Sequence, residues 1–562
     1  MPWPAAYNIR LAVALLCGLC YAGTLQTTDF IRDDRWLIAG NPLMARGVKG
    51  LPALVTTGYV EAVEGAAAPI QEYRPLLSAT FLFQVLTTGM FAPPMHAVNV
   101  ALHIAVCLLL FEVLRERIAL PAAAPAALIF AVLPVHAEAV SYITSRSELL
   151  SALLMLAAWR ALDPSRLRLS AGLAYFFLAL FAKEHAALFP ALLLCDDWVF
   201  HAGVARGRGR VYAGLAACLG AYLLARALVL TNAFHAGVPY FKGTPALIKA
   251  LTVSRFMIAH YVWPSVAGIG LCADFTRPLI ADASTASPAA WACLLLLAAA
   301  ILFALDGMRR RRHWAFWAFA PCLFLLPTSP MIMPIDTIGA ERMLYFPSIG
   351  LCALLGLLYA RFQGRGAKPV LACLLVWYCA CTLARNQAWS SELNFYDASI
   401  ACNPVCAKLR SALGAYWISH GRPSEGVASL QKAIVLDPSL AHPYYNLARL
   451  RWEQGAVGEA ERLLRRALEL EPSSADALTL LGLTLEARGR GDEARACYQK
   501  ALSIIPWNPA ATFDLGRNFL AARRPDLALP YLEAFTKIAP NDPDAPKIAR
   551  LAADIRSARA RP

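Results

Sequence analysis

Long apolar runs dominate residues 1 to about 385, and the density of charged residues rises abruptly from about residue 386 onward. Runs long enough to cross about 30 Å of hydrocarbon predict about eleven membrane-spanning helices. They lie near residues 9–25, 96–114, 121–136, 139–159, 169–183, 185–200, 211–230, 290–305, 313–327, 342–360 and 369–384. The pattern predicts an all-α protein in which a polytopic membrane bundle, residues 1–385, precedes a soluble tail.

Basic residues cluster in the connectors between apolar runs and predict the orientation. With Arg10 in the cytoplasm, the basic run 309–312 returns to the cytoplasm only if the apolar segment 248–270 does not cross. We therefore expect 248–270 to lie in the outer interface, the N-terminus inside and the C-terminus outside. The long first loop, 26–95, and the segment 231–288 then share the extracytoplasmic face, and the first run is a signal anchor.

Proline recurs every 34 residues in the tail, and 34 residues is the tetratricopeptide period. The prolines are Pro404, Pro438, Pro472, Pro506 and Pro540. Small residues such as Gly482 recur where two helices make close contact, and Gly421, Gly455 and Gly489 mark the turn. We predict a linker at 386–404 and an α-solenoid at 405–562. Its repeats are 407–440, 441–474, 475–508 and 509–542, with a capping helix at 543–560.

Composition agrees with a membrane protein. The 562 residues are 58% hydrophobic and 16% charged, with a mean hydropathy of +0.49, which excludes an ordinary soluble enzyme. The net charge of +14 comes from short clusters between apolar runs, so it indicates membrane topology and not nucleic-acid binding. Most of the fifteen cysteines lie within or beside apolar runs and outline neither a disulfide framework nor a zinc site. Cys402 and Cys406, four apart, are able to share a helix face.

Two adjacent carboxylates, Asp33 and Asp34, follow the first apolar run. Neighbouring carboxylates raise one another's pKa, which makes the pair a candidate general base near neutral pH. The alternative is a polar loop that caps the next helix.

Further ionisable residues interrupt the apolar pattern on the face predicted to be extracytoplasmic. Placing a charge at membrane depth costs free energy, so such a residue indicates either a functional site or an ion pair that joins two spans. Guanidinium and ammonium groups at headgroup depth suit a lipid phosphate. The candidate phosphate-binding residues are Arg74, Arg146, Lys183 and Arg342, and the candidate supporting residues are His136, Glu138, Glu184 and Glu341.

The order of these motifs resembles the transmembrane and tetratricopeptide-repeat O-mannosyltransferases, which have the glycosyltransferase-C fold. The resemblance covers nearly the whole chain. It depends on RDDR with NP downstream, YRPLLSATFLF, HAVNVALHIAVCLLL, FAVLPVHAEAVSYITSRSELL, AKEHAALFPALLLCDD, the WP of YVWPSV, ERMLYFPSIG, RNQAW and the repeats. It implies that Asp33 or Asp34 serves catalysis and that basic residues at the membrane edge hold the phosphate of a lipid-linked sugar.

The resemblance further implies a glycosyltransferase that uses a polyprenyl- or dolichyl-phosphate sugar and modifies Ser or Thr of exported proteins. The sugar is mannose or another hexose, because an Ala- and Arg-rich chain with a short repeat array suggests a bacterial member. We expect a bacterial inner membrane with the repeats in the periplasm, or the endoplasmic reticulum membrane in a eukaryote. No cofactor is required and no metal ligands are predicted, although adjacent aspartates leave a divalent cation open. The alternatives are a non-enzymatic envelope scaffold, or the same fold acting on a glycolipid or cell-wall polymer.

Overall fold

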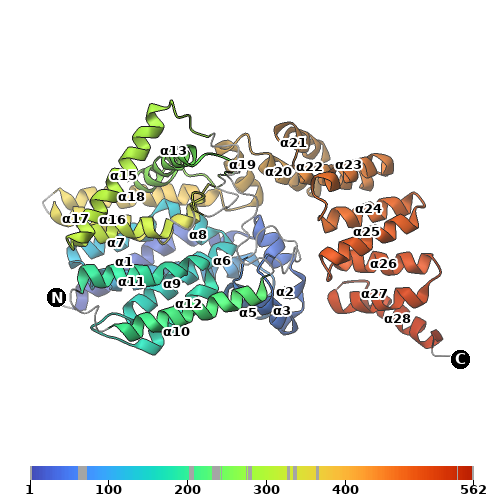
Figure 1. Ribbon diagram of the computed structural model, residues 1–562, viewed down its shortest axis with the longest axis horizontal. Helices are drawn as coiled ribbons and strands as arrows, with labels where there is room; N and C mark the ends of the chain where they lie inside the picture. The colour runs from blue at the N-terminus through green and yellow to red at the C-terminus, as the bar shows by residue number, and fades with distance from the viewer. Residues whose placement is uncertain are drawn as a thin grey trace. The chain divides into compact units, whose positions relative to one another are not determined.

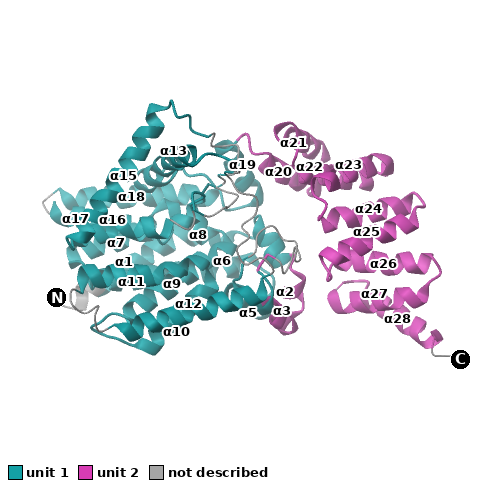
Figure 2. Cartoon of the chain, viewed as in Figure 1, with its two compact units in different colours: residues 1–39, 55–58, 69–403 teal, residues 40–54, 59–68, 404–562 magenta. Residues whose placement is uncertain are grey.

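The computed structural model describes residues 3–60, 72–201, 208–230, 241, 243–273, 275, 282–325, 329–332, 338–362, 366–540 and 542–559. Every regular element in these residues is helical, so the all-α prediction is confirmed for this part of the chain. The chain forms two compact units, which Figure 2 shows in different colours. Unit 1 comprises residues 1–39, 55–58 and 69–403, and unit 2 comprises residues 40–54, 59–68 and 404–562.

The first half of the chain contributes the central helices of unit 1 and several short helices before residue 60, of which those within residues 40–54 belong to unit 2 (Figures 1 and 2). The elements before the first connector are α1 (Trp3–Tyr21), η1 (Ala22–Gln26), η2 (Arg35–Ala39), α2 (Pro42–Ala45), η3 (Gly47–Gly50), α3 (Leu51–Thr56), α5 (Pro75–Thr88), α6 (Ala92–Arg115) and α7 (Leu120–Val132). They are followed by η4 (Pro134–His136), α8 (Ala137–Ser141), η5 (Ile143–Ser145), α9 (Arg146–Ala161), α10 (Leu169–Ala182), η6 (Glu184–Leu188), α11 (Phe189–Phe200) and α12 (Gly209–Val229).

The second half of unit 1 begins with a helix that changes to π-helix. Its elements are α13 (Ala246–Phe256), η8 (Met257–Val262), α14 (Trp263–Ala267), α15 (Pro288–Arg309), α16 (His313–Leu325), η9 (Glu341–Leu344), α17 (Ser348–Arg361), α18 (Ala367–Gln387) and α19 (Glu392–Cys402). The predicted linker, 386–404, therefore contains helix α19. Part of the predicted interfacial segment 231–288 lies outside the described residues, as do residues 61–71 of the first loop.

Helix α7 lies at the centre of unit 1 and packs against α1, α6 and α17. Most of its alanines are fully buried, as at Ala122 and Ala126. A side chain on Gly356 of α17 would come within 2.2 Å of the Ala122 carbonyl oxygen, so glycine is needed there for the two backbones to approach. Close contact of this kind stabilises helix pairs in lipid, where burial from water contributes little.

Within the part of the chain that the structure describes, five helices are long and apolar enough to cross a membrane. They are Tyr7–Gln26, Ala92–Arg115, Gly209–Val229, Pro288–Arg309 and Ala367–Gln387. The pair Leu120–Val132 and Pro134–Ser141, bent by 49°, is a sixth if it forms one broken span. Four shorter apolar helices, α5, α10, α16 and α17, fall below this length. A multi-pass membrane protein is confirmed at this level, and the count of eleven stays a prediction.

Unit 2 contains the repeat helices, which follow one another as antiparallel pairs (Figure 1). They are α20 (Ala407–Ser419), α21 (Pro423–Leu436), α22 (Ala441–Glu453), α23 (Val457–Leu470), α24 (Ala475–Ala487), α25 (Gly491–Ile504), α26 (Pro509–Ala521), α27 (Pro525–Ile538) and α28 (Ala545–Arg559). The glycines predicted to mark the turns, Gly421, Gly455 and Gly489, have positive φ angles of 73°, 78° and 75°. Glycine adopts this left-handed conformation without steric cost, which explains its place at each turn.

Candidate functional site

The acidic pair lies directly before η2, and its two carboxylates differ in environment. Asp34 is 1% exposed, and its carboxylate accepts a hydrogen bond of 2.8 Å from the Thr144 amide. Burial raises the pKa of Asp34 to about 7, although that hydrogen bond acts in the opposite direction. Asp33 is only half-buried, and its carboxylate accepts a bond of 3.3 Å from the Trp36 indole. Asp34 is therefore turned into the protein, and Asp33 is the more accessible carboxylate.

Arg342 lies near this pair and is held by Glu138. One guanidinium nitrogen of Arg342 donates to the Glu138 carboxylate at 2.5 Å, and the Arg342 amide donates to the same carboxylate at 2.9 Å. The Glu138 side chain is 1% exposed, whereas that of Arg342 is 30% exposed. Arg342 also interacts electrostatically with Asp33. A buried carboxylate thus fixes one edge of a guanidinium group whose remaining donors are accessible.

Arg74 and Lys183 each meet a carboxylate from another part of the chain. Arg74 precedes Pro75, the first residue of α5, and donates to Glu184 at 3.0 and 3.1 Å. Lys183 directly follows α10 and forms an ion pair with Glu148 in the first turn of α9. Burial opposes ionisation of Glu184, but Arg74 and Arg226 outweigh it and lower the pKa of Glu184 to about 2.

These pairs form one electrostatic group. The carboxylate of Glu72, which lies 2.7 Å from Arg74, also interacts with the charges of Lys183 and Arg342. The structure therefore brings together most of the ionisable residues singled out in the sequence. The basic group contains Arg74, Lys183, Arg226 and Arg342, and the acidic group contains Asp33, Glu72, Glu138, Glu148 and Glu184.

Three of these residues were not among the predicted site residues. Arg226 lies in the last turn of α12, 3.6 Å from Glu184. An arginine near the predicted outer end of an apolar run departs from the usual charge distribution, and this signal could have identified it. Glu72 and Glu148 were not among the candidates, since nothing in the sequence indicates that Glu148 pairs with Lys183.

Arg146 and His136 lie deeper in unit 1. Arg146 is 1% exposed and donates to the side chains of Asn99 and Gln84 at 2.9 and 2.8 Å, and its guanidinium stacks on Phe81. It therefore joins α5, α6 and α9. His136 is fully buried, and its Nε2 lies 2.7 Å from the Ser348 hydroxyl. With these contacts, the side chains of Arg146 and His136 are both buried and neither lies at the surface of the electrostatic group.

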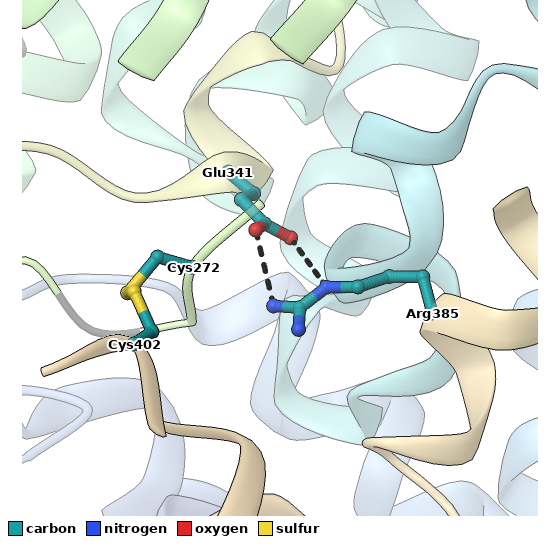
Figure 3. Close-up of a disulfide and its surroundings, with 4 residues drawn as sticks. All are labelled: Cys272, Glu341, Arg385 and Cys402. Carbon is teal, nitrogen blue, oxygen red and sulfur yellow. Dashed lines mark hydrogen bonds and ion pairs between the residues drawn. A yellow bond between two sulfur atoms is a disulfide. The ribbon is translucent and has the colours of Figure 1, made fainter. Parts of the chain in front are cut away.

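Glu341 pairs with a residue that was quoted in the RNQAW motif but was not a candidate site residue. Its carboxylate accepts hydrogen bonds of 3.2 and 3.0 Å from Arg385, in the last turn of α18. Burial raises the pKa of Glu341 to about 8, although Arg385 acts in the opposite direction. Beside this pair, Cys272 and Cys402 form a disulfide (Figure 3).

The sequence interpretation found no disulfide framework and did not predict this single disulfide. Its partners are 130 residues apart, so no local spacing reveals the pairing. Cys402 does not pair with its near neighbour Cys406, which is a buried cysteine outside this disulfide.

One group of possible metal ligands occurs in the described part of the chain. Atoms of Cys17, His103 and Cys107 lie within 4.8 Å of one another. Both ring nitrogens of His103 already have partners, namely the Tyr345 hydroxyl at 2.7 Å and the Ala131 carbonyl oxygen at 3.3 Å. The group therefore resembles a packed core contact more than a metal site, and it does not include the acidic pair.

Comparison with known proteins identifies relatives for both parts of the chain. Two tetratricopeptide repeat models match residues 445–511 and 485–555. The chain is 24% identical over 427 residues to Protein O-mannosyl-transferase F38B6.6 of Caenorhabditis elegans, covering 73% of this chain and 60% of that protein. It is 26% identical over 508 residues to Protein O-mannosyl-transferase TMTC1 of Homo sapiens, covering 78% and 56%.

The chain is thus a distant homologue of the TMTC protein O-mannosyl-transferases and contains tetratricopeptide repeats, as the motifs predicted. It spans about six-tenths of the length of the curated relatives it matches. Among solved structures, it resembles MamA, with 27% identity and a TM-score of 0.23 over 26% of this chain and 81% of that chain. It also resembles the repeat protein YrrB, with 21% identity and a TM-score of 0.25 over 29% and 92%.

Proposed function

We propose that this protein transfers a sugar from a polyprenyl- or dolichyl-phosphate donor to Ser or Thr hydroxyls of exported proteins, on the extracytoplasmic face of its membrane. The observation that carries the proposal is the Glu138–Arg342 pair beside Asp33. It combines a cation held in place by a buried carboxylate with an accessible carboxylate that is able to accept a proton. The homology to protein O-mannosyl-transferases supports the same class of reaction.

In the proposed reaction, Asp33 accepts the proton of the acceptor hydroxyl. The hydroxyl oxygen forms a bond to the anomeric carbon of the sugar as the bond from that carbon to the phosphate oxygen breaks. The lipid phosphate leaves with the bonding electrons, and Arg342 stabilises its charge through donors that Glu138 does not occupy. Because a lipid phosphate is a ready leaving group delivered within the bilayer, the reaction needs no nucleotide-binding domain.

The two aspartates have different proposed roles. Asp34 is buried against the Thr144 amide, so it is suited to hold the loop that carries Asp33. Lys183 and Arg74 already meet Glu148 and Glu184, and we propose that they set the potential around the phosphate. The repeats would bind the acceptor polypeptide or a partner protein, since such arrays commonly bind peptides in their groove.

The test is mass spectrometry of exported proteins from cells with and without the chain, combined with transfer by the purified protein from a synthetic polyprenyl-phosphate hexose. We expect hexose on Ser or Thr only when the native chain is present. Hexose on a glycolipid or cell-wall polymer instead would replace the proposed acceptor. If neither product forms with any hexose donor, the scaffold alternative is favoured.

A further inference from the structure

The Cys272–Cys402 disulfide joins two segments that are far apart in the sequence. Cys272 follows α14, and Cys402 is the last residue of α19. Their Cα atoms are 5.8 Å apart, a separation that suits a disulfide. Cys272 is 1% exposed, whereas Cys402 is partly exposed. The bond therefore attaches the end of α19 to a buried position in unit 1.

The disulfide is also adjacent to the Glu341–Arg385 pair (Figure 3). The backbone amide of Cys272 hydrogen-bonds to the Glu341 carboxylate, which in turn accepts two bonds from Arg385. Arg385 precedes α19 in the chain, so the disulfide and the ion pair tie the ends of one segment to the same place. The residue after Glu341 is Arg342, whose own amide donates to Glu138.

We propose that the Cys272–Cys402 disulfide forms outside the cytoplasm by exchange with a protein disulfide oxidant, and that it positions the Glu341–Arg342 turn of the candidate site. The first half of this proposal is independent of the proposed function. The second half, the positioning of Arg342 toward a lipid phosphate, depends on it. Cys272, Cys402, Glu341 and Arg385 are positioning residues in this scheme.

The chemistry of bond formation identifies the partner by class. The thiolate of one cysteine attacks a disulfide of the oxidant, which forms a mixed disulfide and releases one oxidant thiolate. The thiolate of the second cysteine then attacks the sulfur of the first and displaces the remaining oxidant thiolate. The two protons of the original thiols leave with the bases of the medium or the released thiolates, and the oxidant is reduced to a dithiol. The partner is therefore a thiol–disulfide oxidoreductase of an oxidising compartment.

The bond bears on the orientation of the chain. Cytoplasmic thiols are kept reduced, so a stable structural disulfide implies that both segments face an oxidising compartment. The distribution of basic residues independently predicts that 231–288 and the region after 385 are extracytoplasmic. Glu341, which touches both Arg385 and the Cys272 amide, would lie on the same face.

The first experiment determines the state of the bond in cells. Intact cells expressing the native chain are treated with a membrane-permeant maleimide before lysis, and peptides of the chain are mapped by mass spectrometry with and without reductant. We expect a linked peptide pair containing Cys272 and Cys402 that separates on reduction. Cys406→Ser, which alters a buried cysteine outside the disulfide, keeps the linked pair, whereas Cys402→Ser abolishes it. Maleimide on both Cys272 and Cys402 of the native chain would overturn the disulfide half.

The second experiment tests positioning without requiring turnover. Binding of a short-chain polyprenyl phosphate to the purified protein is compared among the native chain, Cys272→Ser/Cys402→Ser, Cys406→Ser and Arg342→Ala. We expect the double variant to bind about tenfold more weakly, near the loss for removing one charge partner, and Cys406→Ser to bind like the native chain. An unchanged affinity in the double variant, with a weakened Arg342→Ala, would overturn the positioning half. Unchanged affinity in both would count against Arg342 and hence against the proposed function.

The double variant also has to be distinguished from a misfolded protein. The native chain, oxidised and then mildly reduced after purification, provides the same comparison without a substitution. Loss of affinity on reduction and its recovery on reoxidation would support positioning. If reduction changes neither affinity nor, where transfer is measurable, the KM for the donor, the positioning half is wrong.

Discussion

Charged residues in the two units occupy different environments. In unit 1, Arg117 and Asp196 pair at 2.7 Å with side chains 1% and 0% exposed. In unit 2, Glu461 meets Arg465, Arg488 and Arg490, whose side chains are 50%, 48% and 35% exposed. Removing one partner of a buried pair leaves an uncompensated charge, whereas exposed pairs contribute little. Charge substitutions should therefore have large effects in unit 1, and packing substitutions should have the larger effects in unit 2.

The largest expected effect concerns Asp33. Asp33→Asn removes the proposed proton acceptor and should reduce transfer by roughly 100-fold or more, with expression and membrane insertion unchanged because the side chain is only half-buried. Asp29→Asn is the matched control, since an amide oxygen is still able to accept the bond from the Glu392 amide. The measurement is transfer from a polyprenyl-phosphate hexose. Full activity in both Asp33→Asn and Asp34→Asn, and in the double variant, would rule out this loop as the source of the base.

Arg342→Ala should act on the donor. The loss of charge-assisted donors to the phosphate is expected to raise the KM for the lipid donor by about tenfold or more. The same substitution leaves the buried Glu138 carboxylate without its partner, so it should also lower the thermal stability of unit 1. In unit 2, Arg422→Ala removes an exposed partner of Glu425 and should change neither quantity measurably. If Arg342→Ala and Arg422→Ala changed the donor KM and the thermal stability equally, the proposed difference between charged residues of the two units would be wrong.

Gly482→Leu tests packing in unit 2. A Cβ at Gly482 would lie 2.3 Å from the Tyr498 ring, so the larger side chain should destabilise the repeats by about 1–3 kcal/mol through overpacking. The control is Gly458→Leu, because nothing lies within 4 Å of a Cβ at Gly458. Thermal unfolding of both variants is monitored by circular dichroism, and their unfolding midpoints are compared. Equal unfolding midpoints would contradict the close helix contact.

Asp34 provides a smaller, pH-dependent effect. Its folded-state pKa is raised from 3.8 to about 7, so the folded protein keeps a proton that the unfolded chain releases above about pH 4. Stability should therefore fall as pH rises from about 4 to about 7 and then level off. Between pH 6 and pH 8 the native chain should lose about 1 kcal/mol relative to Asp34→Asn, which keeps an acceptor for the Thr144 amide. Parallel pH profiles of the unfolding midpoint would show that Asp34 does not titrate in this range.

The sequence predicted the repeat unit well because its determinants are local. The 34-residue period follows from the packing of adjacent helices. A turn glycine such as Gly455 is needed because its own loop has a positive φ angle, 78°. In unit 1, local apolar runs likewise predicted helices and a membrane class. They predicted helix limits less well. The helix expected at 342–360 begins within η9, and α17 itself begins only at Ser348. The segment 75–88 was expected within a loop but forms α5.

For the candidate site, the sequence by itself determined which residue types interrupt the apolar pattern, because a charge in an apolar run stands out without any partner being known. Only the tertiary structure decided the pairings. Glu138 meets Arg342 across 204 residues, Arg74 meets Glu184 across 110, and Cys272 meets Cys402 across 130. The burial of Asp34 beside an accessible Asp33 was decided in the same way, because it depends on the Thr144 backbone. Contacts between distant segments depend on how helices pack together, and a linear pattern contains no record of that packing.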